Sequence, residues 1–236
     1  HDWFVWHDAY PFEHFEQKVP RFMSEFGFQS LPSASVVKYI NEGALDLNSA
    51  SFGTHQKHPR GTELIKTYLS RDFPEPRNDH EKIYLSQLTQ ALGISKALVA
   101  HRSARPFNMG SLYWQFNDCW PSVSWSSIDH LGQWKALHHA AKHDFDNLLI
   151  AATVSKGSLS VKIVNDHLIP KSGNLQLELM SFTGEIIFSK TLPFTAKANA
   201  STFVSEFDLG VDGFDPRHTV GVLRFVDKQT LVYFDR

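Results

Sequence analysis

One carboxylate lies inside a short apolar run near the start of the chain. The run, Arg21–Pro32, carries Glu25 and has Gly27 two positions later. Strands of a parallel barrel or sheet are buried on both faces and are therefore near-continuous apolar segments. A Glu placed where such a strand ends would project into the crevice in which these folds carry their chemistry. A strand-end Glu held by a salt bridge fits the same residues equally well, so both interpretations are open at this point.

The chain lacks the features of several other chemistries. It has no Gly-x-Ser-x-Gly turn for a serine nucleophile, Cys119 has no obvious base partner, and no glycine-rich loop could hold phosphate. His139 and His143 have the i, i+4 spacing of a helical metal site, but no third ligand is nearby, so a solvated helix face is favoured. Retaining glycoside hydrolysis needs two carboxyl groups about 5–5.5 Å apart, and it also needs aromatic walls. Both kinds of residue are present.

The first 20 residues are crowded with aromatic rings, carboxylates and three His residues, without a helical or alternating period. We therefore expect a polar, aromatic-rich loop. Aromatic faces stack on sugars and carboxylates bind hydroxyl groups, so this loop could line a sugar pocket. A loop whose rings only anchor it to the core is an equally good interpretation.

Residues 20–148 are predicted to alternate strands and helices. Pro32 and Ser33–Ser35 mark a helix start, and Asn78–Glu81 resembles a capping box. The expected elements are the Glu25 strand, a helix from Ser33 to Gly43, a short helix at Thr62–Leu69, a helix from Asn78 to about Arg102, a strand over Leu112–Phe116 and a helix near Gln133–Leu148. The expected core-facing side chains are Tyr84, Leu85, Leu88, Ala91, Leu92 and Leu98 of the long helix, and Trp134, Leu137, Ala141, Phe145 and Leu148 of the last one.

This alternation is typical of a parallel sheet. Glu25 and the segment Trp114–Asp118 would then both lie at carboxyl ends of strands, where α/β barrels carry their chemistry. Two strand–helix units cannot close a barrel that needs eight strands. The sequence therefore predicts the carboxyl-terminal part of a TIM (β/α)8 barrel over residues 1–148.

The pattern changes from about Leu149. Seven short apolar or alternating runs follow, separated by turn-like pieces such as Lys156-Gly157 and Thr183-Gly184; the runs are 149–155, 159–165, 174–182, 185–190, 202–208, 219–226 and 230–235. Such spacing predicts an immunoglobulin-like β-sandwich over residues 149–236. We expect this domain to support or cap the barrel, with carbohydrate binding as the lesser alternative.

The composition limits the classes of partner that the protein is expected to bind. The 236 residues include 42% hydrophobic ones, enough for a substantial core, and all six Trp lie in the first 134 positions. A net charge of −2 with a pI near 6.7 argues against nucleic-acid or membrane-surface binding. One cysteine excludes an intrachain disulfide and a multi-Cys metal site. The first residue is His, so we expect that the chain does not begin where its gene begins. The sequence is compatible with more than one cellular compartment.

Three segments together resemble the β-mannosidases of glycoside hydrolase family 2. Arg21–Pro32 is similar to the nucleophile segment of that family, and Leu112–Pro121, followed by Ser124–Ser127 and Gln133–Lys135, is similar to its last barrel strand and helix. The opening Trp3–His7 resembles a loop that precedes the nucleophile strand. These matches occur in the family's order across residues 1–148, and an immunoglobulin-like domain follows the barrel in these enzymes.

The resemblance implies a retaining hydrolase that releases terminal β-D-mannose from the non-reducing end of β-mannoside oligosaccharides or glycoconjugates, with no metal or other cofactor. Glu25 would be the nucleophile. Trp114 would line the subsite of the terminal mannose, and Trp3 would be a second sugar-contacting ring. His7 would bind sugar or orient Glu25, with a structural role equally compatible. Asn117 and Asp118 would shape the strand end.

One departure from the family matters. Its acid/base Glu follows an Asn on an earlier barrel strand, whereas the pair Asn41-Glu42 lies downstream of Glu25, at a helix end. We therefore expect the acid/base to lie in an amino-terminal remainder of the barrel, outside this chain. Two alternatives remain: a carbohydrate-binding or structural sandwich module, and a family 2 enzyme acting on another glycoside.

Overall fold

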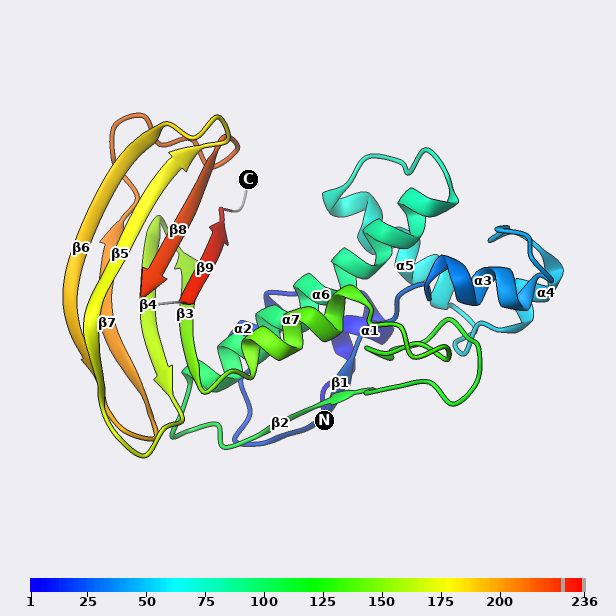
Figure 1. Cartoon of the computed structure of the whole chain (residues 1–236), viewed down its shortest axis with the longest axis horizontal. Helices are drawn as coiled ribbons and strands as arrows, with labels where there is room; N and C mark the ends of the chain where they lie inside the picture. Colours follow the sequence, from blue (N-terminus) through cyan, green and yellow to red (C-terminus); the bar gives the residue numbers. More distant parts are fainter. Residues whose placement is uncertain (226–227, 235–236) are drawn as a thin grey trace. The chain divides into compact units, whose positions relative to one another are not determined.

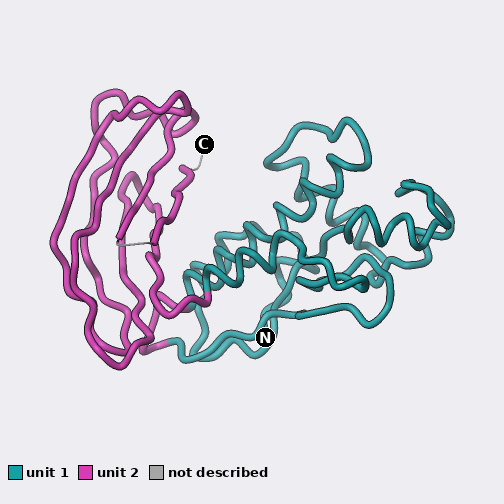
Figure 2. Tube along the Cα trace, in the orientation of Figure 1, with its two compact units in different colours: residues 1–101, 108–144 teal, residues 102–107, 145–236 magenta. Residues whose placement is uncertain are grey.

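The structure is a computed structural model that describes residues 1–225 and 228–234 (Figure 1). It divides into two compact units, shown in Figure 2. Unit 1 comprises residues 1–101 and 108–144, and unit 2 comprises residues 102–107 and 145–236. In the described residues, no helix is both long enough and apolar enough to cross a membrane.

Unit 1 is mainly helical around one pair of strands. Strand β1 (Met23–Gly27) pairs in parallel with β2 (Ser111–Trp114), and Gly27 is the Cα partner of Trp114. The helices are α1 (Phe4–Asp8), α2 (His14–Gln17), α3 (Ala34–Ile40), α4 (Ala50–Thr54), α5 (Gly61–Asp72), α6 (Asp79–Ser103) and α7 (Ala136–Asp144). The predicted strand–helix alternation and the parallel pairing are confirmed.

Helix starts follow the capping signals in the sequence. The Ser33 hydroxyl accepts a hydrogen bond from the Val36 N–H, and the Asn78 side chain accepts one from the Glu81 N–H at 3.0 Å. Each cap satisfies a backbone donor that the first turn of a helix leaves unpaired. Residues 1–20, predicted as a loop, instead contain α1 and α2. Both helices are too short to show a helical period of hydrophobic residues in the sequence.

The prediction for the core-facing stripe of α6 is wrong in part. Tyr84 is 62% exposed and Leu92 is 45% exposed, whereas Ile94 and Leu98 are fully buried. The inward face also carries Gln90, whose Nε2 donates to the Phe28 carbonyl at 2.7 Å and whose Oε1 accepts from Ser30. Because a polar side chain makes these buried contacts, hydrophobic periodicity alone could not locate that face.

Helix α7 is shorter than predicted, since it begins at Ala136 instead of near Gln133 and ends at Asp144. The Asp129 carboxylate accepts hydrogen bonds from the N–H groups of Leu131 and Gln133, which holds residues 129–133 in a loop. Leu137 and Ala141 are buried as expected, but Trp134 and Phe145 are exposed, and Leu148 belongs to the following strand.

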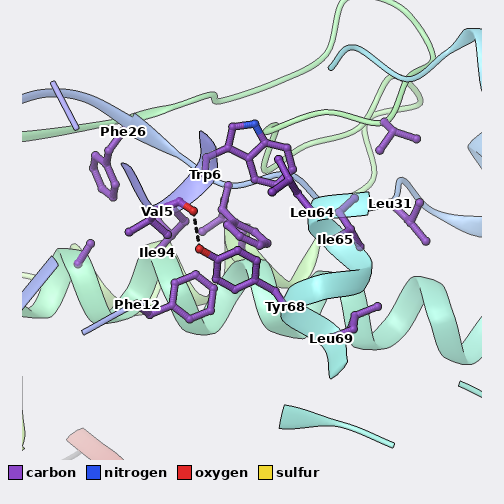
Figure 3. Close-up of a cluster of buried hydrophobic side chains, with 14 of the residues drawn as sticks. Val5, Trp6, Phe12, Phe26, Leu31, Leu64, Ile65, Tyr68, Leu69 and Ile94 are labelled. Atoms are coloured by element: carbon purple, nitrogen blue, oxygen red, sulfur yellow. Dashed lines mark hydrogen bonds between the residues drawn. The ribbon is translucent and has the colours of Figure 1, made fainter. Parts of the chain in front are cut away.

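The core of unit 1 ties the aromatic amino-terminal segment to α5 and α6. Trp6 packs edge-on against Phe28, and Phe12 packs against both Phe28 and Tyr68. The Tyr68 hydroxyl points at the Val5 carbonyl and donates to it (Figure 3). Burial raises the pKa of Tyr68 to about 12, so the hydroxyl keeps the proton it donates. The anchoring interpretation of residues 1–20 therefore holds for Trp6 and Phe12.

Unit 2 contains two antiparallel sheets with a shared apolar core. One sheet has the order β3-β4-β7 and the other β6-β5-β8-β9 (Figure 1). The strands are β3 (Leu148–Ser155), β4 (Ser158–Asn165), β5 (Lys171–Ser181), β6 (Ile186–Ala196), β7 (Ala200–Asp208), β8 (Thr219–Phe225) and β9 (Lys228–Tyr233). All seven predicted strands form, and the predicted strand ends at 226 and 235 lie outside the described residues. The sandwich-like arrangement is confirmed.

We predict that Gly27→Ala destabilises unit 1. A Cβ atom at Gly27 would lie 2.2 Å from the Trp114 carbonyl oxygen, so the two strands would have to move apart. Overpacking of this kind typically costs about 1–3 kcal/mol. The measurement is the free energy of unfolding in urea. Gly53→Ala in α4 is the matched control, because nothing lies within 4 Å of that position. An unchanged stability of Gly27→Ala would contradict the prediction.

Candidate active site

Glu25 lies two residues before the carboxyl end of β1, not at the strand end as predicted. Its Oε1 accepts a hydrogen bond from Trp3 Nε1 at 2.9 Å, and its backbone carbonyl accepts one from the Asp2 N–H. In the part of the chain that the structure describes, no Lys, Arg or His side chain forms an ion pair with Glu25. The alternative of a strand-end salt bridge is therefore wrong for these residues, because an indole and not a cation holds the carboxylate.

A register shift interrupts the regular pairing of β1 at Glu25. Met23 lies opposite Ser111 and Phe26 lies opposite Tyr113, so β1 uses one more residue than β2 between these pairs. This irregularity falls on the two residues between Met23 and Phe26, which include Glu25. Extra residues of this kind bend a strand and redirect its side chains, and they are frequent next to active sites. The half-buried Glu25 is thus an exception to the strand's regular pairing.

Trp3 and His7 lie together because Trp3 is the N-cap of α1 and His7 lies in its last turn. The His7 N–H donates to the Trp3 carbonyl, and the two rings lie 5.4 Å apart between centroids, as expected for residues four positions apart on a helix. Trp3 also packs edge-on against Trp125 at 6.3 Å. The structure therefore groups Glu25, Trp3 and His7, three of the four residues singled out from the sequence.

Trp114, the fourth of these residues, is the last residue of β2. It is 45% exposed, and its Cα partner Gly27 lies two residues beyond Glu25 on the neighbouring strand. Paired strands lie about 4.8 Å apart. Trp114 therefore presents an accessible indole at the strand end next to that of Glu25.

Two residues near Glu25 were given no role in the sequence analysis. Trp125 receives a hydrogen bond from the Gln115 N–H at its carbonyl, and its ring contacts Trp3. His58 contacts both Trp125 and His7. The available signals were that Trp125 lies in the segment Ser124–Ser127, which resembles the family, and that His58 lies close to His55 and Pro59.

A buried polar network fixes the loop that follows β2. The Asp118 carboxylate, 5% exposed, accepts from the hydroxyls of Ser124 at 2.7 Å and Ser126 at 2.6 Å, and forms an ion pair with Lys57. Lys135 is 1% exposed and donates to the Ser124 carbonyl. Asp118 thus shapes the strand end, as the sequence suggested, by anchoring the loop after Trp114.

The two histidines weighed as metal ligands lie on the exposed face of α7. His139 contacts the Trp134 ring, and His143 lies within hydrogen-bond distance of Asp144. Within residues 1–225 and 228–234, no group of three His, Cys, Asp or Glu side chains could hold a metal ion. The pair Asn41-Glu42 follows α3, at a helix end as expected.

Comparisons with known proteins agree with this architecture. Residues 157–235 match the Mannosidase Ig/CBM-like domain. The β-mannosidase of Capra hircus is 31% identical over 199 residues, which cover 77% of this chain and 22% of that protein. Beta-mannosidase A of Emericella nidulans is 26% identical over 232 residues, covering 86% and 25%. The β-D-mannosidase of Dictyoglomus thermophilum superposes with a TM-score of 0.90 at 29% identity, covering 99% of this chain and 30% of that one.

A carboxylate next to indole rings on a parallel strand pair, followed by a mannosidase-type sandwich, is the arrangement expected of a glycoside hydrolase. The chain spans about a quarter of the length of the curated relatives it matches. The relatives and the solved structure together support a fragment of a β-mannosidase of glycoside hydrolase family 2.

We predict a specific pH dependence of stability at Lys135. Burial lowers the pKa of Lys135 from 10.5 to about 8, although the Asp118 and Asp129 carboxylates oppose this shift. Between these two pH values the unfolded chain binds more protons than the folded one, so the contribution of Lys135 to the free energy of unfolding rises with pH.

The measurement is the free energy of unfolding of wild type and Lys135→Met across pH 7–10. The wild type should gain relative to the variant from about pH 8 upwards, by at most about 1.4 kcal/mol per pH unit. Lys142→Met, at an exposed position on α7, the helix that follows Lys135, should show no such trend. A wild-type advantage that stays constant or falls with pH would rule out a depressed Lys135 pKa.

Proposed function

We propose that this chain supplies the nucleophile of a retaining β-mannosidase that releases terminal β-D-mannose from the non-reducing end of β-mannosides. The observation that carries the proposal is the arrangement at Glu25: a half-buried carboxylate at an irregularity of β1, held by an indole N–H within an aromatic cluster. Membership of the family supports the choice of substrate, since the relatives compared are named β-mannosidases.

The geometry suits nucleophilic attack. Trp3 Nε1–H occupies one oxygen of the Glu25 carboxylate, so Oε2 is the oxygen that attacks the anomeric carbon. A bond forms between Oε2 and that carbon while the bond to the leaving-group oxygen breaks, and water later hydrolyses the mannosyl-enzyme ester. Fixing one oxygen limits rotation of the carboxylate and so contributes to orientation.

The proposed roles of the surrounding rings follow from their positions. Trp114, exposed at the end of β2, lines the subsite of the terminal mannose. Trp3 presents a second aromatic face beside the same carboxylate. His7, exposed in the last turn of α1, either binds a sugar hydroxyl or orients Glu25 through Trp3.

We assign residues 1–148 to the carboxyl-terminal part of a TIM (β/α)8 barrel and residues 149–236 to an immunoglobulin-like domain that supports it. The parallel β1–β2 pair supports this assignment, because a TIM barrel consists of eight parallel strands. Two strands are therefore part of a barrel and not a whole one. An amino-terminal remainder supplies the other strands and the general acid. Glu42, at an exposed helix end, is not that acid.

In the longer protein, a 2-deoxy-2-fluoro-mannosyl trap should label Glu25. The trap forms the glycosyl-enzyme but slows its hydrolysis, so peptide mapping identifies the nucleophile. Among aryl β-mannoside, β-galactoside and β-glucuronide, the mannoside should give the highest kcat/KM. An adduct on another residue would sink the Glu25 assignment, and a preference for another glycoside would sink the assigned substrate.

The 236-residue chain alone should show no hydrolysis of an aryl β-mannoside above a Glu25→Gln control. Loss of general-acid catalysis alone typically removes a factor of roughly 10²–10⁴, and the remaining strands of the pocket are also outside the chain. The assay is release of the chromogenic aglycone. Turnover by the chain that disappears in Glu25→Gln would show that a general acid lies within these residues.

A further inference from the structure

His58 is the central ring of an aromatic cluster next to Glu25. The cluster consists of Trp3, Trp6, His7, His58 and Trp125. His58 lies in the segment between α4 and α5, far in sequence from its ring partners His7 and Trp6 of α1 and Trp125 of the loop after β2. Its ring centroid lies 5.2 Å from that of His7, 5.6 Å from that of Trp6 and 6.2 Å from that of Trp125. No other part of the site described above explains why a histidine is placed there.

The backbone fixes the protonation pattern of this ring. The Arg60 N–H donates to His58 Nδ1 at 3.2 Å, so Nδ1 carries its lone pair and the neutral ring keeps its proton on Nε2. The His58 N–H donates in turn to Gln56 Oε1 at 3.1 Å. Burial lowers the pKa of His58, and the charges of His7 and Arg60 lower it further. A neutral ring is the form that packs against indoles without a desolvation penalty.

His58 contacts both rings that hold Trp3. Trp3 lies between His7, at 5.4 Å, and Trp125, at 6.3 Å. His58 packs against each of these two. Trp3 in turn donates its indole N–H to Glu25 Oε1. A continuous line of contacts therefore runs from His58 through two rings to Trp3 and the carboxylate.

Ring packing, more than hydrogen bonding, holds this cluster. The indole N–H groups of Trp6 and Trp125 are buried, and neither finds an acceptor among the residues that the structure describes. Edge-to-face aromatic pairs contribute about 0.5–1.5 kcal/mol each beyond their buried area, and they fix the angle between rings. Removing the central ring would therefore loosen the Trp125 and His7 rings together.

We propose that His58 is a positioning residue for Glu25: its ring fixes His7 and Trp125, these hold Trp3, and Trp3 orients the attacking carboxylate. This inference rests on the proposed role of Glu25 as the nucleophile. Because His58 acts through other side chains, its loss should slow formation of the glycosyl-enzyme while leaving the affinity for the sugar nearly unchanged.

The test uses the longer protein and an aryl β-mannoside whose good leaving group needs little help from a general acid. In His58→Ala, kcat and the rate of labelling by the 2-deoxy-2-fluoro-mannosyl trap should fall about 10- to 100-fold, the loss expected from a displacement near 1 Å, with KM nearly unchanged. His58→Phe keeps the ring and should restore most of the rate. His80→Ala is the matched control, because His80 is exposed in the first turn of α6.

A double-mutant cycle separates positioning from general destabilisation. In Trp3→Phe the hydrogen bond to Glu25 is absent, so adding His58→Ala should cost little more in kcat. Full additivity of the two losses would overturn the proposal, as would an unchanged kcat in His58→Ala or a loss confined to KM. If His58→Ala does not fold, His58→Phe and His58→Leu replace it, and equal rates for these two would overturn the proposal. Activity that persists in Glu25→Ala would instead refute the proposed nucleophile.

Discussion

The close approach of β1 and β2 is the constraint on which the site depends. The two strands meet where Gly27 faces the Trp114 carbonyl oxygen, at a distance that leaves no room for a Cβ atom. With the pairing fixed there, the extra residue of β1 must be accommodated upstream, between Met23 and Phe26. That irregularity is what separates Glu25 from the regular pattern of the strand. One backbone contact thus sets both the strand that carries the carboxylate and the neighbouring strand end that carries an exposed indole.

Beyond Trp114, polar contacts take over from apolar packing. In the loop after β2, the hydroxyls of Ser124 and Ser126 donate to the buried carboxylate of Asp118, and the buried ammonium group of Lys135 donates to the Ser124 carbonyl. Burying such charges is costly, and replacing them with apolar groups is often neutral or stabilising. Their contribution here is geometric: each hydrogen bond fixes one point of a loop that buries little apolar surface apart from Val123. The loop therefore has one shape, and Trp125 keeps its place beside Trp3.

Local signals in the sequence predicted the elements but not their fine positions. Capping residues such as Ser33 and Asn78 located helix starts because they act within one turn. The predictions for the start of α7 and for the inward face of α6 were wrong. Both features depend on hydrogen bonds that Asp129 and Gln90 form with residues outside the helix. The same holds at the site. A Glu in an apolar run could be recognised from sequence, whereas the strand irregularity and the central position of His58 depend on contacts between distant segments.

The surroundings of Glu25 also indicate where the second carboxyl group of the proposed mechanism must come from. Asp2 is the acidic residue bonded to the Glu25 backbone, but its Oδ1 accepts from the Phe4 N–H and its Oδ2 pairs with His14. Asp118 is buried and held by serines and Lys57. A general acid must instead carry a proton and reach the leaving-group oxygen. These neighbouring carboxylates are already engaged by other groups, which is consistent with the proposal that the general acid comes from another barrel strand.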